Sequence, residues 1–525
     1  MDGDHPQRMD DPSSRLKEMG YDQELRRSLG MVSVLGLSFA IMAVPFGLST
    51  TLNIALTNGG PVTIIWGWIF VSIISILIAA SLGEICSVFP TSGGVYCKVT
   101  ASITFGGSQL VLAAITLWNE DYVPTAWQTV LTYWAALVIS VLVNIFFNKS
   151  VHWSQKPVNG HRADMVFAVS IRHLEKLNTL CLYWTGASVI IVRTFCTLHF
   201  LRVLETDKVH DIFLQIIVVI LTMADTRNSA KFAFTHSAYT LTGYGMVAAL
   251  CEEVKNPARE VPRAMVLSVV AAAITGVIYL IPLNFVLPAI EPLLNVASLQ
   301  PIPLFFKIVT GSPSAAFGLL FLIYGIWLFA FIGSLTAASR ATWAFARDGG
   351  IPASFLWKKV NARTQVPINA LLLSAVVNAL LGLIYLGSYA AFNAFTGVAT
   401  ICLGASYGFP ILCSLLRKRA LVKDAPFSLG KFGFVINIIT IVWITFSIVL
   451  FCMPTAIPVT PGSMNYASAV FAGFSAIAVL WYAVNARKHY KGPLISSIRE
   501  KSNGGNLVRS ESGYQSEPKD IVKPL

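Results

Sequence analysis

Long apolar runs without charged side chains dominate the chain. No Asp, Glu, Lys or Arg occurs in residues 28–83, 364–416 or 432–486. Each run is long enough for two membrane-crossing helices of about 20 residues. Polar interruptions divide the three runs near their middles, at 57–61, 387–389 and 458–461. The pattern therefore predicts three helical hairpins.

Further apolar stretches complete the set. They lie near 101–118, 126–147, 264–289 and 315–338, with two more at 181–224 and 237–251. The total approaches about twelve spans of membrane-crossing length. The spans lack the strict alternation of transmembrane β-strands, and a helix satisfies its own backbone in lipid. We therefore expect an all-α polytopic membrane protein.

Composition supports a membrane protein and offers no sign of an enzyme. Hydrophobic residues make up 55% of the 525 residues and charged residues only 12%, whereas a soluble protein is about one quarter charged. The eight cysteines and eight histidines show no metal-ligand or disulfide spacing. There is also no nucleophile elbow or phosphate-binding loop. We expect neither catalysis nor a metal or cofactor.

The net charge of +12 is distributed as the positive-inside rule requires. The connections predicted outside, 57–60, 118–125, 387–390 and 454–465, carry no Lys or Arg, and Lys307 is alone between 290 and 313. The connections that alternate with these, which are predicted to lie inside, are rich in Lys and Arg. This asymmetry orients the protein in a lipid bilayer and argues against a nucleic-acid partner. It predicts a transmembrane domain at 28–490 between cytosolic tails at 1–27 and 491–525.

Two apolar segments contain residues that weaken helices. One holds Pro45 and Gly47, and the other holds Gly243 and Gly245 around Tyr244. Glycine in membrane helices commonly serves close packing, but paired helix breaks also form the binding sites of secondary transporters. The residues alone leave both interpretations open. If the helices are broken, the substrate-binding residues are Ala43, Val44, Pro45, Phe46, Gly47, Thr242, Gly243, Tyr244 and Gly245.

A potassium-channel filter is a third interpretation, because Thr242–Gly245 reads Thr-Gly-Tyr-Gly. A filter needs a pore helix before it and a polar outer mouth after it. Here the apolar residues 246–250 follow and lead to Glu252 and Glu253. We therefore set the channel interpretation aside.

Four stretches, 83–96, 242–263, 339–352 and 392–400, resemble the amino acid–polyamine–organocation superfamily. The similarity is greatest to the fungal amino-acid/choline permeases that include GABA permeases, and it runs from about residue 24 to residue 490. The resemblance implies two inverted five-helix repeats plus two extra helices. It also implies that substrate is held at breaks in helices one and six.

The function that this resemblance implies is secondary active transport of amino acids or related amines such as GABA. Proton coupling is implied too, but we can assign no proton carrier. The expected location is the plasma membrane, with the vacuolar membrane as an alternative. Choline, which favours an aromatic cage, is the alternative substrate, with Phe46, Tyr244 and Tyr324 as candidates. A nutrient sensor that does not transport is a further alternative.

Charged residues near the predicted cytosolic ends are candidates for gating ion pairs. The alternative is that they are ordinary solvated charges, which contribute little. The candidates are Glu84, Glu252, Glu253, Arg259, Arg263, Arg340, Arg347 and Asp348.

Two segments depart from the family pattern. Residues 150–173 are polar and basic, and 193–215 insert charges that are costly in lipid into an apolar span. Joining Val192 directly to Ile216 would restore that span, which suggests a retained intron. Only 237–250 precede the charges of helix six, well short of about 20 residues. We expect this form to be a defective splice form that transports poorly.

Overall fold

The computed structural model divides into two units, residues 1–23 with 492–525 and residues 24–491, and the second unit contains the membrane-crossing helices. The described residues are 16–17, 19–25, 27–57, 60–92, 100–149, 163–204, 233–296, 298–361, 366–387, 389–423, 425–453, 464–487 and 490. Of the predicted anomalous segments 150–173 and 193–215, residues 150–162 and 205–215 therefore lie outside the described residues.

All elements of the described residues are helical, apart from one isolated bridge between Leu29 and Val254. The first half of the chain forms α2 (Met31–Met42), α3 (Val44–Thr50), α4 (Leu52–Thr57), α5 (Gly60–Val88), α6 (Thr100–Ala113), η1 (Ala114–Leu117), α7 (Ala126–Lys149), α8 (Ala163–Leu204), α10 (Ala233–Thr240) and η3 (Tyr244–Glu253). The second half forms α11 (Pro257–Phe285), α12 (Ile290–Leu294), α13 (Ile302–Thr310), α14 (Pro313–Arg347), α15 (Ser354–Trp357), α16 (Ile368–Gly387), α17 (Tyr389–Leu416), η4 (Gly430–Phe432), α18 (Gly433–Cys452), α19 (Ala467–Trp481) and η5 (Tyr482–Ala486).

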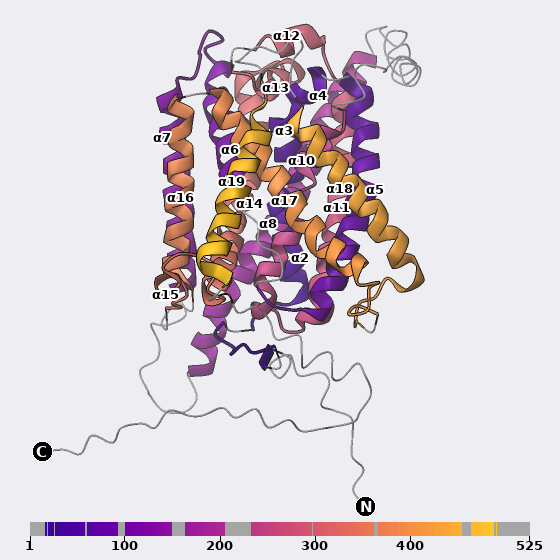
Figure 1. Cartoon of the computed structure of the whole chain (residues 1–525). Coiled ribbons are helices and arrows are strands. Elements are labelled where there is room, and N and C mark those ends of the chain that lie inside the picture. Colours follow the sequence, from indigo (N-terminus) through magenta and orange to yellow (C-terminus); the bar gives the residue numbers. More distant parts are fainter. Residues whose placement is uncertain are drawn as a thin grey trace, which may run out of the picture. The chain divides into compact units, whose positions relative to one another are not determined.

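Within the described residues, 11 helical segments are long and apolar enough to cross a membrane. They lie roughly parallel in a bundle (Figure 1). The broken segment α10–η3 is not counted among them, because each of its two pieces is too short. Counting it as one further span brings the total to the predicted number of about twelve. This all-helical architecture confirms the expected polytopic fold.

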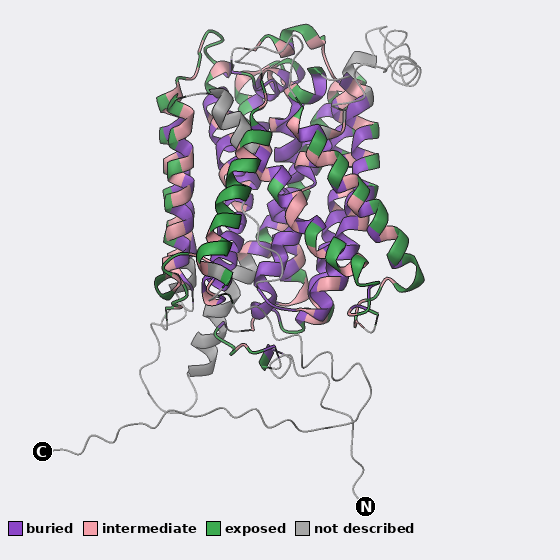
Figure 2. Cartoon of the chain, viewed as in Figure 1, coloured by how far each residue is buried: buried purple, intermediate pink, exposed green. Residues whose placement is uncertain are grey.

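The helices differ in how deeply they lie in the bundle (Figure 2). The segment Met31–Thr50 is 83% buried, whereas Ala467–Asn485 is only 6% buried. The apolar side chains of the outer helices face outwards, including Val442 and Leu480 at 63% and 66% exposure. Such exposure is unfavourable in water and natural against lipid tails. The broken helices therefore lie at the protein core, surrounded by lipid-facing helices.

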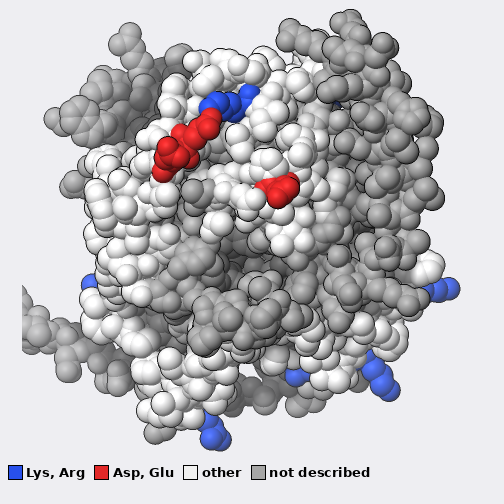
Figure 3. Space-filling view, turned by 90° about the horizontal axis from the view of Figure 1, so that it is seen from above, with Lys and Arg blue, Asp and Glu red and all other residues white. Residues whose placement is uncertain are grey.

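The two ends of the bundle carry different short elements. One, the α12 end, holds α4, α12 and α13, and the other, the α15 end, holds α15 and the 417–432 connection (Figure 1). The α12 end shows few charged side chains among the residues coloured in Figure 3, with a basic group beside an acidic one. An ion pair of Lys307 with Glu120, 2.6 Å between Nζ and Oε1, lies there.

Helix α8 continues where an interruption was expected. It runs without a break from Ala163 to Leu204 and so passes straight through Val192 and Arg193. The span at Leu177–Leu201 is long enough to cross a membrane, so joining Val192 directly to Ile216 is not needed to complete it. Arg193 is exposed on this helix, and a long basic side chain can extend its charged head towards the membrane surface. The expected half-span ending at Val192 is therefore wrong.

Candidate substrate site and inner gate

The first helix break separates α2 from α3 at Ala43. This residue adopts the left-handed conformation (φ 45°, ψ 50°), which costs a non-glycine residue free energy. Pro45 lies in the first turn of α3 and has no N–H, so the Ile41 carbonyl loses its usual helical donor. The sequence 43–47 thus interrupts the helix as predicted.

The second break separates α10 from η3 at residues 241–243. Gly243 has φ +90°, a conformation that glycine adopts at little cost. After the break the chain continues as a 3-10 helix over Tyr244–Glu253. Gly243 therefore serves a backbone break, as the broken-helix interpretation required.

The two breaks lie against each other in the core. A Cβ atom added to Gly47 would come 2.7 Å from Thr240 Cγ2, and one added to Gly243 would come 3.0 Å from Ile41 Cγ2. Residues 43–47 and 243–245 are all buried. Both halves of the first broken helix also bind α11, through Ser38–Ser268 at 2.7 Å and Ser49–Tyr279 at 2.9 Å. Backbone groups freed from helical bonding are thus gathered in one small buried region.

A tyrosine from α17 completes this region. The Gly245 N–H donates to the Tyr407 hydroxyl at 3.0 Å, and the Tyr244 and Tyr407 ring centroids are 5.3 Å apart. A Cβ atom on Gly245 would come 2.4 Å from Tyr407 Cε1, so glycine is required for this approach. Sequence reasoning missed Tyr407, because nothing in its local pattern separates it from a packing tyrosine.

At the α15 end, buried ion pairs join η3 to α14. Arg340 Nε donates to Glu253 Oε1 at 2.8 Å. Arg347 binds both oxygens of Glu252 at 2.9 Å, a bidentate geometry that is among the strongest available. The side chains of Arg340 and Glu252 are 2% and 0% exposed. These predicted partners are thus buried, and the solvated-charge alternative is wrong for them.

Other gating candidates lie around these pairs. Asp348 Oδ1 is 3.8 Å from Arg347 Nε, so it adds a weaker contact to the same guanidinium. Arg259 and Arg263 lie exposed on the first turns of α11. Arg347 also lies 4.7 Å above the Trp343 ring. We call the pairs Arg340–Glu253 and Arg347–Glu252 the inner pairs.

The segment that precedes α2 is fastened to the same place. The Ser28 and Leu29 N–H groups donate to the Glu253 carbonyl, both at 2.9 Å. The Lys255 N–H donates to the Leu29 carbonyl at 3.1 Å, and Arg27 Nη1 donates to the Val254 carbonyl at 3.2 Å. The entry to the first broken helix and the exit from the second are therefore tied together beneath the breaks.

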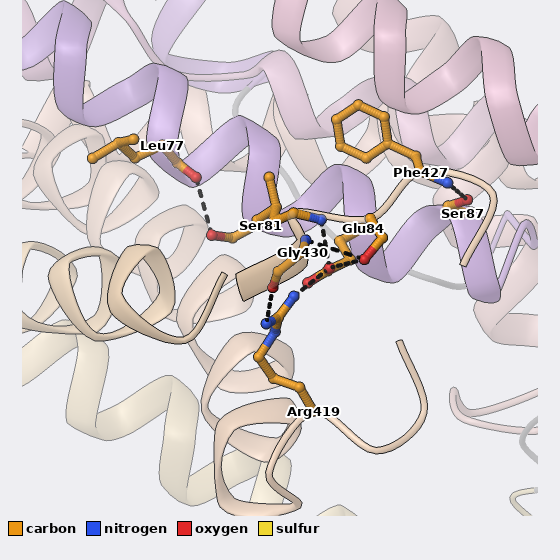
Figure 4. Close-up of polar contacts among 9 residues, drawn as sticks. Leu77, Ser81, Glu84, Ser87, Arg419, Phe427 and Gly430 are labelled. Carbon is orange, nitrogen blue, oxygen red and sulfur yellow. Dashed lines mark hydrogen bonds and ion pairs between the residues drawn. The ribbon is translucent and has the colours of Figure 1, made fainter. Parts of the chain in front are cut away.

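Glu84 near the end of α5 forms a separate clamp (Figure 4). Its Oε1 accepts from Arg419 Nη2 at 2.5 Å and from the Leu429 N–H at 2.9 Å. Arg419 Nη1 also donates to the Gly430 carbonyl at 2.9 Å, and Arg419 itself has a left-handed backbone with φ 56°. Glu84 thus holds the 417–432 connection, rather than pairing with Arg340 or Arg347.

This arrangement defines a class of protein before any comparison. A buried pair of helix breaks in a bundle of membrane-crossing helices, with ion pairs closing one end, is typical of a secondary transporter.

Comparison with known proteins gives the family. A model of the amino acid permease family matches residues 165–475, more than half of the chain. The polyamine transporter TPO5 of Saccharomyces cerevisiae is 31% identical over 93% of this chain and 80% of its own. The amino-acid permease BAT1 of Arabidopsis thaliana is 30% identical over 93% of this chain and 97% of its own. A choline transporter of Saccharomyces cerevisiae is 27% identical over 89% of this chain and 83% of its own.

The chain belongs to the amino acid permease family of the amino acid–polyamine–organocation superfamily. It is an integral membrane protein and a permease rather than an enzyme, and its family carries small molecules.

Proposed function

We propose that this permease carries amino acids or related zwitterions such as GABA, coupled to protons, and that it binds them at the two helix breaks. The observation that carries the proposal is the buried contact between the breaks, at Gly47–Thr240 and Ile41–Gly243. N–H groups at the start of a helix attract a carboxylate. Carbonyls that lose their usual helical donor, such as that of Ile41, attract an ammonium group.

The charge of the site favours a substrate that is neutral overall. Residues 31–57 and 233–251 contain no Asp, Glu, Lys or Arg. A polyamine carries several positive charges, and burying them without carboxylates would cost several kcal/mol each. A zwitterion brings both charges itself, and backbone groups can pair with each. This favours the amino-acid relatives over the polyamine relative as a guide to substrate.

Tyr407 supports the assignment of the carboxylate position. Its hydroxyl accepts a hydrogen bond from the Gly245 N–H, so this donor is already directed at an oxygen acceptor. A substrate carboxylate is a stronger acceptor than a neutral hydroxyl. We infer that the carboxylate takes the place of the Tyr407 oxygen when substrate binds.

Choline is the second candidate, because aromatic side chains are also present. Tyr244 and Tyr407 lie tilted against each other beside the break, with 36° between their ring planes. Aromatic faces attract a quaternary ammonium. Choline lacks a carboxylate, however, so it would leave the Gly245 N–H without a charged partner.

We further propose that the α15 end faces the cytosol of a cell whose plasma membrane holds the protein. The support is the charge asymmetry of the positive-inside rule. At the α12 end Lys307 is the only Lys or Arg between residues 290 and 313, while Arg347, Lys358 and Arg417 lie at the other end. Under this orientation the inner pairs form a cytosolic gate. An impermeant reagent that labelled a cysteine at Lys358 from outside would reverse the orientation.

Uptake into proteoliposomes that contain the full chain tests the function. Labelled neutral amino acids, GABA, choline and a polyamine are supplied one at a time, with and without an inward proton gradient. We expect gradient-dependent accumulation of a zwitterion. Accumulation of choline alone favours the second candidate. Saturable binding without uptake identifies a sensor or a splice form that cannot transport.

A further inference from the structure

One histidine lies between the outer halves of the two broken helices. His236 belongs to α10, is 1% exposed, and precedes by one helical turn the residue Thr240 that touches Gly47. Its Nδ1 lies 2.6 Å from Thr51 Oγ1 and 3.1 Å from the Thr51 carbonyl oxygen. Thr51 follows α3 directly. The imidazole therefore joins helix six to helix one on the α12 side of the breaks.

The hydrogen bonds around Thr51 fix the tautomer of this histidine. Thr51 Oγ1 lies 2.7 Å from the Gly47 carbonyl oxygen, which only accepts, so the hydroxyl proton is donated there. Thr51 then offers His236 two acceptors, Oγ1 and its own carbonyl oxygen. Only a protonated Nδ1 can satisfy them. In the neutral ring the lone pair therefore lies on Nε2.

Nε2 is buried and has no hydrogen-bond partner among the described residues. A buried polar atom in a native protein normally has a partner, so an orphan at the core of a transporter calls for an explanation. Its lone pair is the one site on the neutral ring that can take up a further proton. A proton taken up here would place a positive charge one turn from the contact between the breaks.

We propose that Nε2 of His236 is the proton-binding site that couples this permease to a proton gradient. The proposal rests on the proposed function and supplies the carrier that sequence reasoning could not assign. The step is a simple transfer, in which a proton from the outer solution binds the Nε2 lone pair and later leaves to the inner solution. No covalent bond of the substrate changes.

Coupling of proton and substrate follows from the surroundings that a positively charged imidazole ring requires. In the closed arrangement an Nε2–H has no acceptor, and burying an unpaired imidazolium is unfavourable. The protonated ring is stable only where water reaches it or where a negative charge offsets its own. A zwitterionic substrate whose carboxylate lies at the Gly245 N–H brings such a charge into the same buried region. Proton and substrate therefore enter the closed state together.

The relay through Thr51 strengthens this link. His236 Nδ1–H donates to Thr51 Oγ1, which donates to the carbonyl of Gly47 inside the first break. Charging the ring makes Nδ1–H a stronger donor and polarises that chain of hydrogen bonds. The state of the histidine is thus transmitted to the backbone that we propose binds substrate.

The other ionisable groups nearby are few. Helices α3 and α4 carry none, and those of α5 are Glu84 and Cys86, near its other end. On α10 itself Tyr239 is hydrogen-bonded to Ser102 of α6. Tyr279 of α11, which packs against α3, is bonded to Ser49. Of these groups, His236 is therefore the one whose ordinary pKa lies near neutral pH.

The test compares wild type with His236→Gln in proteoliposomes. Counterflow exchange of labelled substrate needs no proton gradient, whereas accumulation does. At one proton per substrate, a gradient of about one pH unit supports accumulation of about tenfold. We expect wild type to exchange and accumulate, and His236→Gln to exchange without accumulating. His199→Gln on α8 is the matched control and should accumulate as wild type does.

The proposal is overturned if His236→Gln accumulates normally. It is also overturned if exchange disappears in a folded His236→Gln, because the residue would then bind substrate. Should His236→Gln fail to fold, Thr51→Val breaks the relay while leaving the ring, and normal accumulation in that variant counts against the proposal.

A second measurement separates this proposal from the proposed function. If wild type moves no substrate at all, permease activity fails, but whether the closed fold holds His236 neutral can still be measured. A histidine held neutral in the fold makes the protein less stable as the pH falls. The melting temperature of wild type should therefore drop more between pH 7.5 and 5.5 than that of His236→Gln. Equal drops would show that the closed fold protonates this ring as readily as the unfolded chain does, which would contradict the coupling argument.

Discussion

The centre of the bundle and its α15 end use opposite means to hold the same two helices. At the centre, Gly47 and Gly243 bring backbone groups together, and the breaks contain no formal charge. At the α15 end, Glu252 and Glu253 bind two arginines in buried ion pairs. Both regions are removed from water, but only one contains permanent charges.

The difference reflects what each region must do. A site made of backbone dipoles is stable when empty, because it leaves no charge unpaired, and it becomes favourable when a zwitterion supplies charges of its own. A buried ion pair is favourable only while both partners meet, and separating it exposes two costly charges to be rehydrated. Such a pair therefore favours two discrete states of this end of the bundle, one closed with the pair formed and one open with both charges in water. The comparison therefore teaches why the proposed binding site and the proposed gate lie apart along one helix.

The largest effect is expected from filling the breaks. Gly47→Leu and Gly243→Leu should abolish uptake while leaving membrane insertion intact. A side chain at 47 meets Thr240, and one at 243 needs a positive φ that branched residues avoid. Labelled uptake normalised to the amount of inserted protein measures the loss.

Gly318→Leu is the control for those variants. Gly318 lies exposed on α14 with nothing within 4 Å of an added Cβ atom, so it should transport normally. If both break variants keep wild-type uptake, the glycines serve packing alone. Gly276 shows what that role looks like, since a Cβ there would come 2.2 Å from Trp68 within two continuous helices.

The next largest effect is expected from the inner pairs. Arg347→Gln leaves Glu252 buried without its partner, which typically costs about 3–5 kcal/mol and should favour opening at the α15 end. Cys251 is buried beside Glu252, so its reaction with a thiol reagent reports that opening. In a variant that keeps only this cysteine, Arg347→Gln should raise the labelling rate by about tenfold or more.

Two comparisons sharpen this test. Arg263→Gln removes an exposed charge at the same end and should leave Cys251 protected. The double variant Glu252→Gln with Arg347→Gln removes both charges of that pair and should lie between wild type and the single variant. Unchanged labelling in Arg347→Gln would show that the inner pairs serve stability without gating.

The success of sequence reasoning also differed between these regions. The apolar runs, the breaks at 43–47 and 242–245, and the acidic partners Glu252 and Glu253 were predictable, because each has a local signature. Arg340 and Arg347 were also among the predicted partners of these two glutamates, but other contacts were not predictable. Tyr407, Thr51 and Arg419 are distant in sequence from the groups they bind, and no periodicity reveals such contacts.

The mistaken interruption at Val192 has a different cause. Hydropathy treats Arg193 as the end of an apolar run, but helix formation depends on backbone bonds that a single exposed arginine does not break. Sequence reasoning also passed over His236, because a lone histidine in an apolar segment is usually an ordinary packed core residue. Its significance comes from burial and from the unpartnered Nε2, which only coordinates reveal.

A smaller effect is expected from the clamp at Glu84. Glu84→Gln removes the charge that binds Arg419 but keeps an oxygen for the Leu429 N–H. We expect a loss of about 1–3 kcal/mol in stability, seen as a lower melting temperature, with uptake reduced only modestly. Lys418→Gln, an exposed neighbour, should change neither. A loss of uptake as large as that of Arg347→Gln would make the clamp part of the gate.

The smallest effect is expected from the ion pair at the α12 end. Glu120 is 73% exposed in its pair with Lys307, and the hydrogen bond and charge of Lys307 lower the pKa of Glu120. A lowered pKa means that the pair stabilises the fold above the unfolded pKa and loses that effect as the pH falls through the folded one. Both values lie below about pH 4.5, so nothing should change between pH 5 and 8. Glu120→Gln should leave uptake and melting temperature at wild-type values, because water screens an exposed pair. If this variant instead altered uptake as strongly as a break in the inner pairs, the α12 end would also be gated by charge, and the contrast between an ion-paired inner end and a charge-poor outer half would fail.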